Sequence, residues 1–133
     1  METFSRETLN PWFVSGFVDG EGSFTFSRSS RQLAVYFAIK GADRSFLETV
    51  QAFFGGIGKI YKVGAGYMFR VTRATELLVV VSHFDSYPLQ TQKHAAYEVW
   101  RSMVQLKRSF RGSTREALEA LAIQLSKTVA RRS

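Results

Sequence analysis

The stretch WFVSGFVDGEGSF, Trp12–Phe24, decides how the chain begins to fold. Asn10 and Pro11 come before it; asparagine caps the first amides of a helix, and proline suits the first helical position. The residues up to Val18 are apolar almost all round, which predicts a buried helix. We expect the DGEG tetrapeptide to end this helix through a glycine with a positive φ angle, and a strand to follow.

Beyond this stretch the apolar residues recur at every second position, in two pairs of segments. Such alternation predicts two antiparallel hairpins, each with one buried and one solvent-facing side. The predicted strands are Ser23–Ser29, Gln32–Lys40, Gly58–Val63 and Tyr67–Arg73. Helical spacing predicts one helix after the N-cap Asp43 and three more over about residues 75–84, 91–107 and 113–129. The order α-ββ-α-ββ-α-α-α indicates an α+β fold.

The amino-acid composition excludes several classes of function. The 133 residues fit one domain, and an apolar share of 45% with 12 Phe requires a core. The absence of cysteine excludes disulfides and thiol catalysis, and two histidines leave little for a nitrogen-ligated metal. We expect an intracellular protein, because neither a membrane span nor a signal peptide is evident. The net charge of +7 favours an acidic partner, nucleic acid first and an anionic membrane surface second.

The excess charge lies mainly at the end of the chain. Residues 107–133 hold seven basic and two acidic side chains, a net charge of +5, whereas residues 1–106 carry only +2. Two interpretations stay open for the basic segment: a solvated tail that aids solubility, or an arm that contacts phosphate groups.

Asp19 and Glu21 are two carboxylates on either side of Gly20. Carboxylates, backbone carbonyls and water form the oxygen ligand set that Mg²⁺ prefers, and glycine lets a carbonyl approach a ligand closely. The same residues are also typical of a simple turn, in which the acid accepts hydrogen bonds from backbone amides. From these residues alone, a metal site and a structural turn both remain open.

The solvent-facing side of the two hairpins carries polar and basic residues but no carboxylate. These residues are Ser23, Thr25, Ser27, Ser29, Arg31, Gln32, Tyr36, Lys40, Lys59, Tyr61, Met68, Arg70 and Thr72. A twisted β-ribbon fits the major groove of DNA, where mixed polar side chains can read base edges. Because an ordinary solvated face usually holds acidic residues too, their omission favours a surface for nucleic acid.

Together these features resemble a known family. Trp12–Phe24 closely resembles the signature of the LAGLIDADG homing endonucleases, with Val14–Gly22 at the nine motif positions. Three more segments are similar to that family: the strand end at Phe37 and Ile39, FFGGIGKI at Phe53–Ile60, and YPLQTQK at Tyr87–Lys93. The similarity runs in order over about Pro11–Leu106, most of the chain.

The resemblance implies an αββαββα fold, with a saddle-shaped antiparallel sheet laid on double-stranded DNA and further helices at the C-terminus. We expect one domain over residues 1–133, with a core of about 10–107 and a basic helical extension over 108–133. Members with one motif work as homodimers, which implies paired motif helices and a long pseudo-palindromic DNA site. The implied interface has small residues where the helices touch and an acid that caps the partner helix. It comprises Phe13, Ser15, Gly16, Phe17 and Asp19.

The resemblance also implies the chemistry, a Mg²⁺-dependent cleavage of both DNA strands that leaves 3′ overhangs, with Mn²⁺ as a substitute metal. Glu21 matches the acidic position that binds the metal, and Gly20 would supply a carbonyl oxygen. Lys93 resembles the basic residue near the scissile phosphates, where it stabilises charge or positions water. The alternatives are that Lys93 is a surface lysine near a helix start, or that a shifted register places Thr91 or Gln92 at this position. His83 and His94 are expected to be structural or surface residues.

One segment departs from the family pattern. Many members have Gln, often followed by Lys, where this chain has Gly41-Ala42, which leaves Lys40 as a neighbouring candidate for organising solvent around the nucleophile. An alternative is therefore kept: a maturase or regulator of the same fold that binds DNA or intron RNA and cuts weakly or not at all. For an intron-encoded protein of this kind we expect a bacterial or archaeal cytoplasm or an organelle, and no membrane partner.

Overall fold

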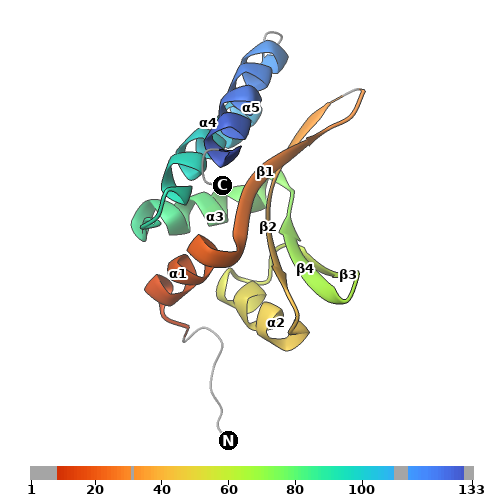
Figure 1. Cartoon of the computed structure of the whole chain (residues 1–133), viewed down its shortest axis with the longest axis vertical. Helices are drawn as coiled ribbons and strands as arrows, with labels where there is room; N and C mark the ends of the chain where they lie inside the picture. Colours follow the sequence, from red (N-terminus) through yellow and green to blue (C-terminus); the bar gives the residue numbers. More distant parts are fainter. Residues whose placement is uncertain (1–8, 31, 110–113, 131–133) are drawn as a thin grey trace, which may run out of the picture.

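The computed structural model describes residues 9–30, 32–109 and 114–130. Within them the chain forms five helices and four strands, in the order expected from the sequence (Figure 1). The helices are α1 (Pro11–Glu21), α2 (Arg44–Phe53), α3 (Ala74–Ser86), α4 (Lys93–Ser109) and α5 (Thr114–Ala130). The strands are β1 (Gly22–Arg28), β2 (Leu33–Gly41), β3 (Lys59–Val63) and β4 (Gly66–Val71). None of the described helices combines the length and apolarity needed to cross a membrane.

The four strands form one antiparallel sheet in the order β1-β2-β4-β3. In Figure 1 the helices lie on one side of the curved sheet, and no described helix covers its other side. Phe24 lies opposite Phe37 in the register, and Phe37 lies opposite Val71, so apolar residues of three strands meet on the helix side. The α+β fold expected from the sequence is confirmed.

Local signals explain where α1 begins, but not how it ends. The side-chain oxygen of Asn10 accepts a hydrogen bond from the Trp12 amide at 2.8 Å, as a helix cap requires. At its other end α1 continues directly into β1 at Gly22, whose φ is −92°. The expectation of a helix-ending glycine with positive φ is therefore wrong. Gly22 must be small for another reason, because a Cβ atom there would lie 2.6 Å from Cγ1 of Val18.

Aromatic side chains form the part of the core that holds β1 against the helices. Phe24 is 3% exposed. It packs edge-on against three rings with centroids 5.0–5.4 Å away, those of Phe84, Tyr97 and Trp100. The Trp100 indole N–H donates to the carbonyl oxygen of Tyr36 at 2.9 Å, which joins α4 to β2. The strand that directly follows Glu21 is thus fixed to the helix layer.

Helix α5 packs into the same core. Its inward side chains are at most 4% exposed: Leu118, Ala122 and Leu125. Arg28 at the end of β1 donates to Glu119 of α5 at 2.9 Å, so an ion pair also connects α5 with the β1–β2 hairpin. The interpretation of the basic segment as a solvated tail is therefore wrong for α5.

Candidate nucleic-acid interface and metal site

The polar side of the sheet brings the expected DNA-facing residues together. The register aligns two rows across the strands: Ser23, Ala38, Arg70 and Lys59, and beside them Lys40, Met68 and Tyr61. All described members of the expected set are exposed or half-buried, namely Ser23, Thr25, Ser27, Ser29, Gln32, Tyr36, Lys40, Lys59, Tyr61, Met68, Arg70 and Thr72. Arg31 lies outside the described residues.

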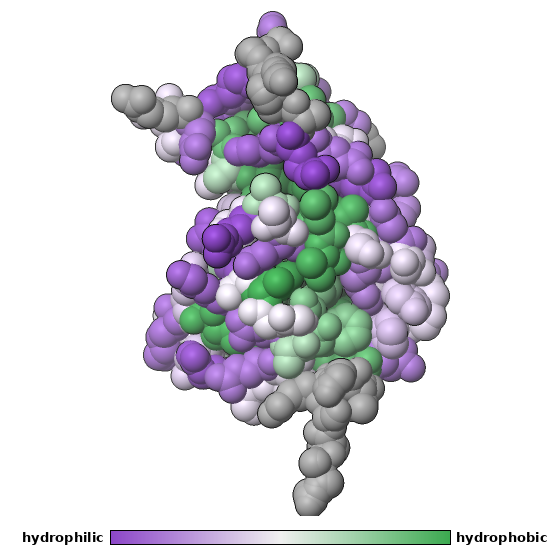
Figure 2. Space-filling view, turned by 180° about the vertical axis from the view of Figure 1, so that it is seen from behind, coloured by the Kyte–Doolittle hydropathy of each residue, from purple (hydrophilic) through white to green (hydrophobic). Residues whose placement is uncertain are grey.

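A hollow of about 540 Å³ lies at the α1 end of this face. Residues of five elements line it: Gly20, Glu21, Gly22, Ser23, Thr25, Tyr36, Ala38, Lys40, Met68 and Lys93. In the space-filling view of Figure 2 the molecule is concave on the side where the sheet lies, and hydrophilic residues gather along the lower rim of that concavity. The fold therefore brings one carboxylate and two lysines, far apart in the sequence, to one polar hollow.

Glu21 is the last residue of α1, and its side chain is exposed at the edge of this hollow. Its carboxylate has no hydrogen-bond or ion-pair partner within the described residues. The C-terminal end of a helix carries partial negative charge and carbonyl oxygens without helical partners. Glu21 and the Gly20 carbonyl together therefore favour a cation, and these hard oxygen donors suit Mg²⁺.

The described residues of one chain provide only part of a metal site. In the part of the chain that the structure describes, no group of three or more His, Cys, Asp or Glu side chains could hold a metal ion. Mg²⁺ keeps several waters and is commonly bound by one or two carboxylates together with phosphate oxygens. The residues present thus fit a metal that takes Glu21 from this chain and its other ligands from water, DNA phosphate or a second carboxylate.

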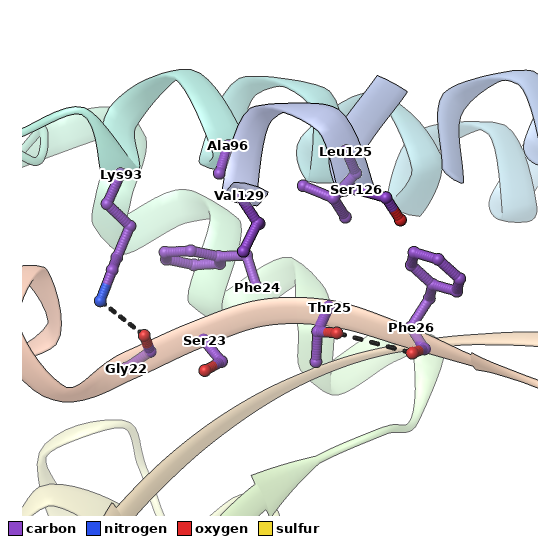
Figure 3. A pocket seen from close by; sticks show the side chains of 10 residues that line it. All are labelled: Gly22, Ser23, Phe24, Thr25, Phe26, Lys93, Ala96, Leu125, Ser126 and Val129. Carbon is purple, nitrogen blue, oxygen red and sulfur yellow. Dashed lines mark hydrogen bonds between the residues drawn. The ribbon is translucent and has the colours of Figure 1, made fainter. Parts of the chain in front are cut away.

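Lys93 lies behind this site, at the start of α4. Its side chain is 4% exposed and reaches to the end of α1, as Figure 3 shows. The ammonium group donates to the carbonyl oxygens of Val18 at 2.9 Å and Gly22 at 2.6 Å. The alternative of a surface lysine is therefore wrong. These bonds satisfy carbonyls on both sides of Glu21 and hold the turn from which its carboxylate projects.

Asp19 orders the turn before α4 in its own chain. One carboxylate oxygen accepts from the Gln90 amide at 2.7 Å, and the other accepts from the amide of Thr91 at 3.3 Å and from its hydroxyl. The Thr91 hydroxyl in turn accepts from the Lys93 amide at 3.1 Å, which connects this turn to the start of α4. Both oxygens of Asp19 thus bind donors within its own chain, and its expected capping of a partner helix stays a prediction.

Helix α1 exposes one face and buries the other. Phe13 is 48% exposed and stacks on the half-buried Phe17. Outside α1 itself, no atom of the described residues lies within 4 Å of a Cβ atom built on Gly16. Ser15 points inward instead: it is 2% exposed, and its hydroxyl donates to the carbonyl oxygen of Tyr87 at 2.6 Å. The expectation that Ser15 belongs to a helix-pairing interface is wrong, because the residue packs inside its own chain.

His83 has a structural environment, as expected from the sequence. Its Nε2 lies 3.0 Å from the Ser15 hydroxyl oxygen. Since that hydroxyl gives its proton to the Tyr87 carbonyl, the Nε2 atom carries the proton of the neutral ring. Burial lowers the pKa of His83 to about 4, so the ring is neutral at pH 7.

Arg70 and Tyr36 form a pair that sequence reasoning missed. The guanidinium carbon of Arg70 lies 3.9 Å from the centre of the Tyr36 ring. The Nε atom of Arg70 is buried and has no hydrogen-bond partner among the described residues. The residues come from β4 and β2, so only knowledge that these strands pair could have indicated the contact.

Gly41 and Ala42 add no polar side chain to the site. Gly41 ends β2 opposite Tyr67, and a Cβ atom there would rest 3.6 Å from Leu47. Lys40 lines the same hollow as Glu21. It therefore stays a candidate for binding phosphate or organising water beside Glu21.

Comparison with known proteins identifies the family to which this fold belongs. A model of the LAGLIDADG endonuclease family matches residues 14–104. The chain belongs to the LAGLIDADG endonuclease family.

Relatives and solved structures agree with this membership. Probable intron-encoded endonuclease 2 of Neurospora crassa is 31% identical over 125 residues, 85% of this chain, and an uncharacterized 50.9 kDa protein in ND4 intron 1 of Podospora anserina is 35% identical over 116 residues, 78% of it. The LAGLIDADG meganuclease I-AabMI, bound to uncleaved DNA, is 28% identical, with a TM-score of 0.81 over 86% of this chain. I-SmaMI, bound to an uncleaved DNA target in the presence of calcium ions, is 29% identical, with a TM-score of 0.81 over 90%.

All of these proteins are longer than the present chain. The chain spans 28% of the Neurospora relative and 26% of the Podospora relative. It spans 44% of the I-AabMI chain and 46% of the I-SmaMI chain. The 133 residues thus correspond to less than half of each compared polypeptide.

Proposed function

We propose that the chain acts as a site-specific homing endonuclease that makes metal-dependent cuts in both strands of a long pseudo-palindromic DNA site. The observation that carries the proposal is the exposed Glu21 carboxylate, without a protein partner among the described residues, at the edge of a polar hollow. That hollow opens beside a sheet face whose charged residues are basic, and DNA is the partner such a face favours.

In this proposal Glu21 and the Gly20 carbonyl hold a divalent ion, Mg²⁺ with Mn²⁺ as a substitute. Such an ion lowers the pKa of a bound water and stabilises charge on a phosphate. Lys93 is a positioning residue: by donating to the carbonyls of Val18 and Gly22, it keeps the Glu21 carboxylate directed at the scissile phosphate. Lys40 in the same hollow neutralises phosphate charge or orients water.

Cutting both strands requires two such units, because one chain supplies one Glu21. We propose a homodimer that pairs through the exposed face of α1, where Phe13 offers apolar surface and Gly16 allows close approach. The two sheets then contact the two halves of the site, and cuts across the minor groove leave 3′ overhangs. If the 133 residues are half of a longer polypeptide, the same pairing joins its two halves.

A second candidate function is a maturase or regulator that binds DNA or intron RNA without cutting. The observation that favours it is the pair Gly41-Ala42, which gives the site no side chain to organise water. The fold, the polar face and the paired helices would be the same in this case. Only a cleavage experiment separates the two functions.

The test uses a supercoiled plasmid that carries the uninterrupted insertion site of the gene. With Mg²⁺ the wild type should linearise the plasmid, and Glu21→Gln should leave it supercoiled. Glu48→Gln, a matched change at an exposed glutamate of α2, should cut like the wild type. No linear product from the wild type contradicts the proposal, and tight binding without cutting supports the second candidate.

A further inference from the structure

We propose that Arg70, held against Tyr36, reads a guanine in the major groove at one fixed position in each half of the DNA site. The inference rests on the proposed function, since it names what one residue of that DNA-binding face recognises. It starts from two observations: the stacked pair at 3.9 Å and the buried, unpartnered Nε atom of Arg70.

The contact with Tyr36 leaves the two terminal nitrogens of Arg70 available to donate hydrogen bonds to a base. The ring of Tyr36 attracts the planar cation and holds it in one orientation before DNA arrives. Because Nε is covered, the two terminal nitrogens remain to donate, and they have no partner within the described residues. A fork of two N–H groups matches the O6 and N7 acceptors that guanine presents in the major groove.

The surroundings of Arg70 favour base reading over simple phosphate attraction. Ala38, its neighbour in the row on β2, is 5% exposed and adds no polar or charged group that would engage Arg70. Lys59, its neighbour on β3, supplies a flexible positive charge suited to phosphate. No carboxylate pairs with Arg70 in the described part of the chain, so its charge is not neutralised. We therefore expect Arg70 to contribute base specificity and Lys59 to contribute affinity.

The experiment selects bound sequences from a library of randomised DNA duplexes, with Ca²⁺ present in place of Mg²⁺. The wild type should enrich sites with a fixed G at one position of each half. Arg70→Gln should reduce the preference for that G by about ten- to a hundredfold and leave the other positions unchanged. Tyr36→Leu should reduce the same preference less, and Tyr36→Phe, which keeps the ring, should retain it.

Lys59→Gln is the matched loss of charge in the same row. It should weaken binding evenly across sequences and lower the salt dependence, as expected for a phosphate contact. Arg70→Lys keeps the positive charge but lacks the two parallel N–H donors of the guanidinium, so it should also lose the G preference. This variant tests the inference even if Arg70→Gln is unstable.

Two results overturn the inference while leaving DNA binding intact: enriched sites without a fixed G, or an Arg70→Gln effect that is equal for all sequences. Failure of the wild type to enrich any sequence overturns this inference together with the proposed function.

Discussion

Replacing Lys93 with methionine removes the two hydrogen bonds that hold the end of α1, while keeping a side chain of similar length. A hydrogen bond from a charged group contributes about 1.5–3 kcal/mol, and relief from burying the ammonium group offsets part of the loss. The Val18 carbonyl also keeps a second donor, the Gly22 amide. We therefore expect the free energy of unfolding to fall by about 2 kcal/mol.

For a chain of this length, such a loss lowers Tm by about 7 °C, which circular dichroism measures directly. Lys40→Met is the matched control, because it removes the same charge from an exposed position in the same hollow and should change Tm by less than about 2 °C. In the cleavage assay both variants should be slower, Lys93→Met through a displaced Glu21 and Lys40→Met through lost phosphate contact. A Tm of Lys93→Met within about 2 °C of the wild type would refute the reasoning.

Three further perturbations test other parts of the structure. Gly16→Leu should keep the fold, since Gly16 is exposed and a Cβ atom there meets no described atom outside its own helix within 4 Å. The variant should give monomers in sedimentation velocity, and a persistent dimer contradicts pairing through this face. Lowering the pH from 6.5 to about 4 should cost roughly 1–2 kcal/mol of stability, because His83 binds a proton in the unfolded chain but not in the folded one. In urea unfolding, the stability of His83→Asn should depend less on pH than that of the wild type. An identical pH dependence would refute the assignment of this effect to His83. Leu125→Ala should cost about 2–4 kcal/mol, whereas Ile123→Ala, at a side chain 52% exposed, should cost less than about 1; equal effects contradict the packing of α5.

Features set by local chemistry were predictable from the sequence. Asn10 and Asp43 cap helices as expected, because each accepts a hydrogen bond from a nearby amide of the helix that it precedes. The alternation of apolar residues gave the correct faces of the strands, since a period of two fixes which side chains share a side. The position of Glu21 between a helix and a strand was predictable from the DGEG segment, and its role as a metal ligand stays a prediction from the family resemblance.

Features set by contacts across the fold were not predictable. A lysine in a sequence normally indicates the surface, and only the approach of α4 to the end of α1 buries Lys93. In the sequence Ser15 is a small residue of an apolar helix, but the hydrogen-bond partners of its hydroxyl, His83 and Tyr87, lie about 70 positions further along the chain. The pairing of Arg70 with Tyr36 likewise depends on the crossover that brings β4 beside β2. In each case the chemistry of the side chain was predictable from the sequence, whereas its neighbours in the fold were not.

The most direct test of the two-Glu21 mechanism uses a mixed dimer, with one wild-type chain and one Glu21→Gln chain isolated through two different affinity tags. On a supercoiled plasmid with the insertion site and Mg²⁺, each Glu21 should serve one strand, so the mixed dimer should produce nicked circles. Linear product at the wild-type rate, or plasmid that stays supercoiled, would contradict the assignment of one Glu21 to each cut.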